Sequence, residues 1–113
     1  MKLKKTKKVK SAVMGYVTTR NRAEALKIAK RLVGSRLVAC ANVIPSMSSI
    51  YRWEGKVETA AETVLIVKSS QEKVEAITQE IKKLHSYAVP CVVFWKITQG
   101  NSDYFKWLKE NVF

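Results

Sequence analysis

RLVACANVIPSMSSIYRWEGKVETAAETVLIVKSS, residues 36–70, is a segment rich in β-forming residues. In its first part, residues 37–44 alternate between two faces as a strand does, and residues 50–53 continue the strand. A turn around Gly55 follows, where a glycine is free to adopt a positive φ. Residues 57–67 then lead back along an increasingly apolar path. This pattern predicts a long β-hairpin.

The predicted hairpin is much longer than the helix expected before it. An extended chain from Leu37 to Trp53 spans on the order of 55 Å at ~3.3 Å per residue. The preceding helix, of about 13 residues, spans only ~20 Å. One subunit therefore cannot cover the ribbon. Either the hairpin curls sharply at Pro45, or its outer half pairs with another chain, and its apolar, aromatic tip favours the second alternative.

The rest of the chain predicts shorter elements around the hairpin. Strands are expected at residues 12–18 and 91–98, and helices at 22–33, from about 70 to 84 and at 103–111. The order β-α-β-β-α-β with a C-terminal helix predicts an α+β, ferredoxin-like sandwich, with one antiparallel sheet and two helices on one face. Large apolar groups from Tyr16, Phe94 and Trp95 are expected near the other face, which predicts an oligomer.

The first two helices each carry their apolar residues on one face. The predicted faces consist of Ala25, Ile28, Ala29, Leu32 and Val33 in the first helix, and Val74, Ile77, Ile81 and Leu84 in the second. Thr19 or Asn21 is available to cap the first helix. The spacing of Ser69 and Glu72 is typical of a capping box at the start of the second. His85 is expected to end that helix.

Half of the net charge lies at the start of the chain. The 113 residues, one domain by length, carry +12, and six of these charges come from lysines in residues 1–10. Residues 11–113 carry fifteen basic and nine acidic side chains. Since residues 1–11 have almost nothing to bury, we expect a disordered basic arm there and a folded domain over residues 12–113. No apolar run approaches the ~18 residues of a membrane span, so no membrane partner is expected.

Nucleic-acid binding is one function that the basic charge suggests. RNA-recognition domains share the β-α-β-β-α-β order, but they stack bases on aromatic residues of the central strands. The third strand expected here, residues 63–67, has no aromatic residue. A nucleic-acid role therefore rests on the lysine arm alone and is not expected.

Few residues in the chain carry reactive side chains. Cys40 and Cys91 lie in apolar β-like runs, which is typical of reduced, buried thiols in a cytoplasmic protein. The sequence has no glycine-rich phosphate loop and no zinc-finger spacing. A cysteine–histidine nucleophile would require the fold to bring His85, the single histidine, to a thiol. We therefore expect no enzymatic activity.

Two segments closely resemble the divalent-cation-tolerance (CutA) family. They are residues 36–45 (RLVACANVIP) and 49–57 (SIYRWEGKV). The resemblance continues through the strand that ends in Lys68, then at Leu84–His85, Tyr87 and Val89–Pro90, and over residues 103–108. It implies a ferredoxin-like subunit in a tight homotrimer whose long hairpins form an intersubunit sheet. It also implies a link to tolerance of copper and other divalent metals, and some animal members are linked to processing or anchoring of acetylcholinesterase. No enzymatic activity is established for the family.

His85 and Cys91 are the candidate metal ligands. A histidine with a thiolate suits copper or zinc, but two ligands are too few without donors from a second subunit. A packed or capping imidazole is the favoured alternative for His85, and packing is favoured for Cys40. The chain also departs from the family, because Ala88 stands where members commonly have a glutamate. Val17 lies near a position where some bacterial members have a cysteine.

Four residues are candidates for a pocket or an intersubunit contact. Tyr51 and Trp53 share one face of the hairpin, where interface packing is favoured over ligand stacking. Lys68 ends an apolar strand, and it either binds an anionic ligand or lies in solvent. Tyr87 belongs to the segment that resembles the family. A trimeric small-molecule sensor with ligands in intersubunit clefts is the alternative function, by analogy of fold alone.

Overall fold

The computed structural model of the chain describes residues 12–112, so the predicted basic arm, residues 1–11, lies outside the described residues. The elements are β1 (Ala12–Thr19), α1 (Arg22–Gly34), β2 (Cys40–Trp53), β3 (Lys56–Ser70), a 3-10 turn (Gln71–Lys73), α2 (Val74–Leu84), β4 (Val92–Ile97) and α3 (Ser102–Glu110). Each predicted element is present within a few residues of its expected bounds. None of the described helices has both the length and the apolar composition needed to cross a membrane.

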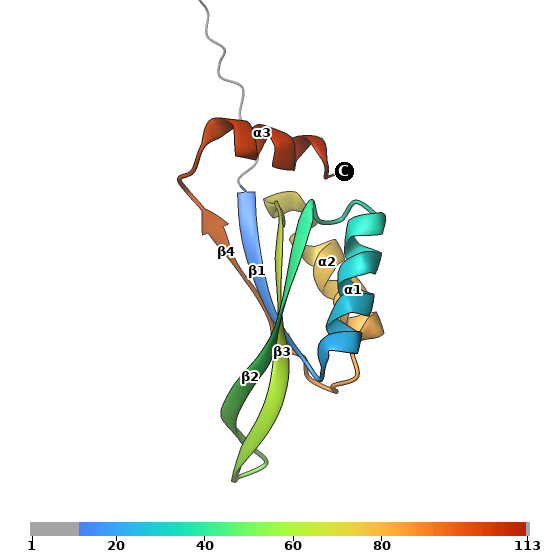
Figure 1. Ribbon diagram of the computed structural model, residues 1–113, viewed down its shortest axis with the longest axis vertical. Coiled ribbons are helices and arrows are strands. Elements are labelled where there is room, and N and C mark those ends of the chain that lie inside the picture. The colour runs from blue at the N-terminus through green and yellow to red at the C-terminus, as the bar shows by residue number, and fades with distance from the viewer. Residues whose placement is uncertain (1–11, 113) are drawn as a thin grey trace, which may run out of the picture.

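The four strands form one antiparallel sheet in the order β2-β3-β1-β4. Helices α1 and α2 lie together on one side of this sheet, and α3 lies across the end opposite the hairpin tip (Figure 1). This is the ferredoxin-like α+β arrangement, as the element order predicted.

The hydrophobic core fills the space between the sheet and the two helices. It takes alternate residues from the central strands and the apolar faces of α1 and α2. Its fully or nearly fully buried members include Val17, Leu65, Val67, Ala25, Ile28, Ala29, Leu32, Ile77 and Ile81. The predicted helix face is wrong at Val33, which is 42% exposed. The next residue along a helix is rotated by about 100°, so Val33 leaves the buried stripe that includes Leu32.

Helix α1 begins at one of the two predicted caps. The side chain of Asn21 accepts a 2.9 Å hydrogen bond from the backbone N–H of Glu24. The capping box predicted at Ser69 is wrong, because β3 continues to Ser70. The Ser69 hydroxyl instead donates a 2.6 Å hydrogen bond to the backbone carbonyl of Leu37, which fastens the α1–β2 connection to the sheet.

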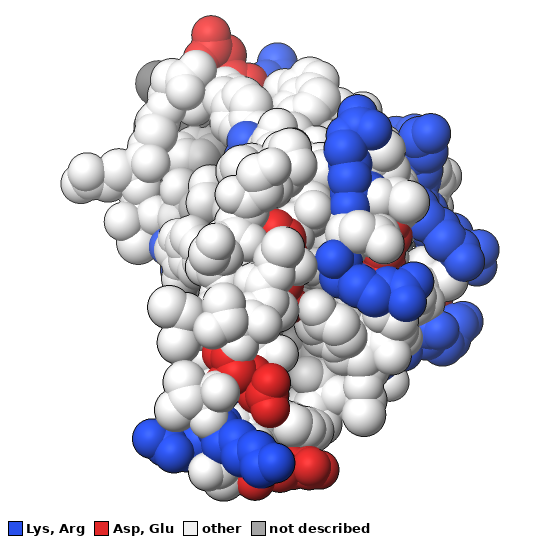
Figure 2. All heavy atoms as spheres, turned by 60° about the horizontal axis from the view of Figure 1, so that its bottom comes forward, with Lys and Arg blue, Asp and Glu red and all other residues white. Residues whose placement is uncertain are grey.

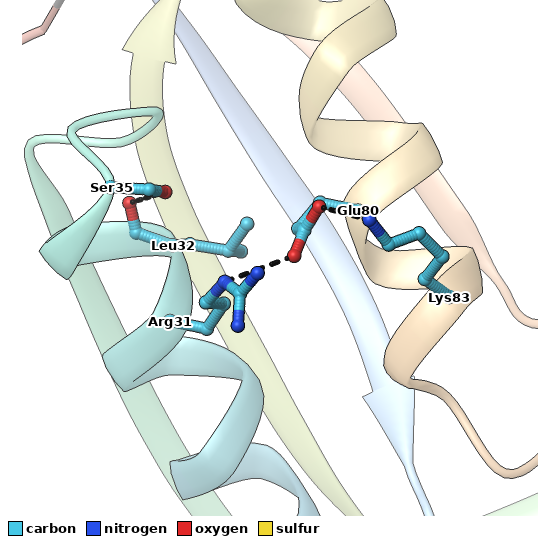
Figure 3. A network of polar contacts seen from close by, with 5 residues as sticks. All are labelled: Arg31, Leu32, Ser35, Glu80 and Lys83. Atoms are coloured by element: carbon cyan, nitrogen blue, oxygen red, sulfur yellow. Dashed lines mark hydrogen bonds and ion pairs between the residues drawn. The ribbon is translucent and has the colours of Figure 1, made fainter.

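An ion-pair network joins the two helices (Figure 3). The Glu80 carboxylate on α2 lies 3.1 Å from Nε of Arg31 on α1 and 3.3 Å from Nζ of Lys83 on its own helix. Two largely exposed cations share one carboxylate, so the network adds a modest electrostatic contact between α1 and α2.

The hairpin projects well beyond the helices (Figure 1). Its strands stay paired as far as Trp53 and Lys56, and the described chain measures 60 × 25 × 22 Å. At Pro45 and Ser46, β2 contains one residue more than β3, and Ser46 adopts a φ of 67°. This β-bulge turns the ribbon locally without reversing it, so the alternative of a sharp curl at Pro45 is wrong. The tip closes with Gly55 at a φ of 81°, as expected.

The sheet face away from α1 and α2 carries exposed apolar groups. In the registers of β1 and β4, Tyr16 pairs with Val93 and Met14 with Trp95 on this open face. Trp95 is 48% exposed. Phe94 lies on the helix side instead, over Gly15, where a Cβ would meet its ring at 2.6 Å. The structure thus assigns Trp95, but not Phe94, to the open face.

Candidate functional site

A cleft of about 430 Å³ begins at the base of the hairpin and extends along one face of it toward the tip. Three segments form its walls: the end of β1, the paired strands β2 and β3, and the connection from α2 to β4. The lining residues are Thr18, Ser49, Tyr51, Trp53, Glu62, Tyr87, Ala88, Val89 and Cys91. Lys and Arg side chains gather over α1 and α2 in the view from the hairpin end (Figure 2), whereas none of the lining residues is basic.

Alternation along β2 places three lining residues on one side of the hairpin. Ser49, Tyr51 and Trp53 are each two residues apart, so their side chains point to the same face of the ribbon. Tyr87 approaches from the α2–β4 connection and completes an aromatic wall. The structure therefore brings together three of the four residues that the sequence suggested for a pocket, namely Tyr51, Trp53 and Tyr87.

Glu62 is the lining residue that the sequence analysis missed. It is only 7% exposed, and its Oε2 accepts a 2.6 Å hydrogen bond from the Tyr87 hydroxyl. Burial and the neighbouring Glu62 carboxylate together raise the pKa of Tyr87, so the phenol stays protonated and acts as a donor. The sequence signal that could have identified Glu62 is its position as the single charged residue in the run 59–67.

His85 is fully engaged in hydrogen bonds. Its Nε2 lies 2.8 Å from the carbonyl oxygen of Thr18, and its Nδ1 accepts the backbone N–H of Tyr87 at 3.1 Å. This pattern fits one neutral tautomer, with the proton on Nε2. The backbone N–H of His85 also donates to the carbonyl of Ile81 and ends α2. In this arrangement the ring offers no free lone pair to a metal, and it ties the α2–β4 connection to β1.

The described residues of one subunit do not fit a resident divalent metal. Cys91 is exposed as a residue and lines the cleft, but partial burial of its thiol and the nearby Glu62 carboxylate raise its pKa, which favours the thiol over the metal-binding thiolate. No group of three or more His, Cys, Asp or Glu side chains within residues 12–112 could hold a metal ion. Of the two positions at which the sequence analysis expects a departure from the family, Val17 is buried in the core and Ala88 lines the cleft.

Lys68 and Cys40 lie together, away from the cleft. Lys68 pairs with Cys40 in the β2–β3 register, and its Nζ is 3.9 Å from the Cys40 Sγ. The same ammonium lies 5.7 Å from the ring centroid of Tyr104 on α3. Lys68 therefore packs between the start of the hairpin and the C-terminal helix, and it is not a cation of the cleft.

Comparisons with known proteins identify relatives of this chain. The family described as CutA1 divalent ion tolerance protein matches residues 13–111. "Protein CutA, chloroplastic" from Arabidopsis thaliana is 36% identical over 111 residues, which are 98% of this chain and 61% of that protein. "Divalent-cation tolerance protein CutA" from Thermus thermophilus is 41% identical over 95 residues, which are 84% of this chain and 92% of that protein.

The solved structures agree with this assignment. The crystal structure of CutA1 from Oryza sativa matches with a TM-score of 0.88 at 37% identity and covers 90% of this chain and 94% of that one. The chain spans only 56% to 64% of the length of the first plant and frog relatives. The family match nevertheless extends over almost all of the residues described here. The chain belongs to the CutA1 divalent ion tolerance protein family.

Proposed function

We propose that this chain contributes to tolerance of divalent cations as a non-enzymatic homotrimer, with the cleft at the hairpin base as its binding site. Family membership supports the role in divalent-cation tolerance. A binding role without catalysis is supported by the cleft chemistry. The only cysteine in the cleft has a raised pKa, and both ring nitrogens of His85 are hydrogen-bonded. No nucleophile–base pair is therefore poised there.

The projecting hairpin is the observation that carries the trimer proposal. The face of its distal half that carries Ile50 and Val57 has no cover from the same chain, and these residues are 73% and 64% exposed. Trp53, on the other face of the ribbon, and the open-face Trp95 are also exposed, so apolar groups are uncovered on both faces of the hairpin and on the sheet. Exposed apolar surfaces of this kind mark protein interfaces. In addition, the backbone N–H and C=O groups along the free edge of β2 form hydrogen bonds when a strand of another chain pairs with them.

Light scattering of the purified chain tests the assembly. A trimer of 12.8 kDa chains has a mass of about 38 kDa. The variant Trp95→Asp places a charge on the open face and should lower the mass, whereas Lys27→Asp on the exposed surface of α1 should leave it unchanged. A monodisperse 12.8 kDa species in the parent protein would overturn the proposal.

Copper binding at Cys91 is a second candidate function. The observation that favours it is the exposure of this thiol inside the cleft, beside the Glu62 carboxylate. Copper(I) prefers thiolate donors, and a complete shell would need donors from a neighbouring subunit. Titration with copper(I) tests it: Cys91→Ser should abolish stoichiometric binding, while Cys40→Ser should not. Equal binding by the parent and by Cys91→Ser would exclude Cys91 as a ligand.

A further inference from the structure

We propose that the cleft binds a small organic cation, such as a quaternary ammonium ion, with Glu62 as its counter-charge and Tyr51 and Tyr87 as its aromatic walls. The inference rests on the binding role proposed above. It names the chemical class of the ligand, and it is argued from residues of a single chain.

The charged side chain in the cleft is the first observation that favours a cationic ligand. Among the described residues that line the cleft, Glu62 is the only Asp, Glu, Lys or Arg. Its side chain is 7% exposed, and the described residues give it one hydrogen bond, from Tyr87 to Oε2. A covered carboxylate with no cation beside it is unfavourable in apolar surroundings. A cationic ligand would remove this penalty when it binds.

The aromatic side chains that line the cleft are the second observation that favours a cationic ligand. Tyr51 from β2 and Tyr87 from the α2–β4 connection line the cleft on the side of Glu62, whereas Trp53 pairs with Lys56 at the far end, toward the hairpin tip. The faces of aromatic rings attract cations electrostatically, and rings combined with a carboxylate form the cages that recognise quaternary ammonium groups. The hydrogen bond from Tyr87 to Glu62 holds one ring in contact with the carboxylate. The two features are therefore parts of one built site.

Size and surroundings argue against the other ligand classes. The volume of about 430 Å³ lies in the range of small-molecule pockets and greatly exceeds that of a bare metal ion. An anion would meet the Glu62 carboxylate without any basic lining residue to offset the repulsion. Lys68, the cation that could have favoured an anion, lies against Cys40 and Tyr104 instead.

Calorimetric titration of the full chain with matched probes tests the proposal. Choline and benzyltrimethylammonium are the cations, and 3,3-dimethyl-1-butanol is the uncharged carbon isostere of choline. We expect saturable binding of at least one cation with millimolar or tighter affinity, and binding of the isostere at least tenfold weaker. Equal binding of choline and its isostere would show an apolar pocket and overturn the proposal. Absence of saturable binding by both cations would also overturn it.

Two isosteric variants test whether Glu62 is the counter-charge of the bound cation. Glu62→Gln keeps an acceptor for the Tyr87 hydroxyl and removes the charge, so cation affinity should fall about tenfold or more. Glu110→Gln removes the same charge from an exposed position of α3, at the end of the molecule opposite the hairpin tip, and should change affinity by less than about twofold, as for a screened surface charge. Equal losses in both variants, or no loss in Glu62→Gln, would contradict the assignment.

The same samples separate this inference from the assembly proposal. Light scattering of the protein used for calorimetry reports its mass independently of ligand. A trimer that binds neither cation would refute the ligand class and leave the assembly intact. A monomer that binds choline through Glu62 would refute the assembly and leave the ligand class intact.

Discussion

The Tyr87 hydroxyl donates a 2.6 Å hydrogen bond to Oε2 of Glu62. The bond joins the α2–β4 connection to β3 at the base of the hairpin, and both residues line the cleft. Because Glu62 is almost fully covered, this donor offsets part of the cost of keeping a carboxylate there. The wall of the cleft and the stability of the fold are therefore linked through one contact.

Removing the hydroxyl should destabilise the protein. We expect Tyr87→Phe to lower the free energy of unfolding by about 1–2 kcal/mol, since a covered carboxylate loses its hydrogen-bond donor. Urea unfolding monitored by circular dichroism measures the change. Tyr104→Phe is the matched control, because the Tyr104 hydroxyl takes part in no hydrogen bond among the described residues, and it should cost less than ~0.5 kcal/mol. Equal losses in the two variants would contradict a special role for the Tyr87 contact.

The raised pKa of Tyr87 predicts its behaviour in alkali. The folded protein holds this proton more tightly than the unfolded chain, so the associated stability is fully present below the unfolded value of about 10. It is lost as the pH rises through the higher folded-state pKa. The difference in phenolate absorbance between the parent and Tyr87→Phe should therefore develop above pH ~10. A difference that develops fully at or below that pH would show that the burial and hydrogen bond have no such effect.

We expect His85 to contribute to the stability of the folded protein. His85→Ala leaves the Thr18 carbonyl and the Tyr87 amide without their partners, so we expect a loss of about 2 kcal/mol in urea unfolding. Lys82→Ala, at an exposed position of α2, serves as the control and should change stability little. Unchanged stability in His85→Ala, combined with lost copper binding, would instead identify the imidazole as a metal ligand.

Gly15 should be required for packing in the sheet. A Cβ at this position would lie 2.6 Å from the Phe94 ring and 2.8 Å from Cγ2 of Val67. Gly15→Ala is therefore expected to cost about 1–3 kcal/mol through overpacking. At Gly34 nothing lies within 4 Å of an added Cβ, so Gly34→Ala should be neutral or slightly stabilising in the same thermal or urea unfolding measurement. A neutral Gly15→Ala would show that Phe94 moves aside without cost.

Local patterns predicted most of the fold. The alternation in residues 37–44 and the glycine at the tip both act within a few residues, so the hairpin could be read from the sequence. The Ser69–Glu72 pattern failed because a capping box and a strand end place similar residues together. In the structure, the Ser69 hydroxyl bonds to the distant Leu37 carbonyl and not to the start of α2, and a local pattern does not reveal that contact. The direction of Phe94 likewise depends on Gly15 in another strand.

The site was harder to predict because it is built from distant segments. Lys68 and Glu62 occupy the same face of β3, but six residues separate them, which is about 20 Å along a strand. The sequence therefore could not show that Glu62 joins Tyr51 and Tyr87 while Lys68 joins Cys40 and the C-terminal helix. His85 was correctly seen as a helix end. Its two ring hydrogen bonds became apparent only when the fold placed Thr18 beside it.

Hydrogen–deuterium exchange of the hairpin amides tests most directly whether other chains cover the projecting hairpin. In the parent protein at micromolar concentration, amides of residues 48–59 should be protected nearly as well as those of the central strand β1, because strands from other subunits cover them. In Trp95→Asp, the same amides should exchange faster while β1 stays protected. Exchange of residues 48–59 in the parent at the rate of an unstructured chain, with β1 protected, would contradict the account.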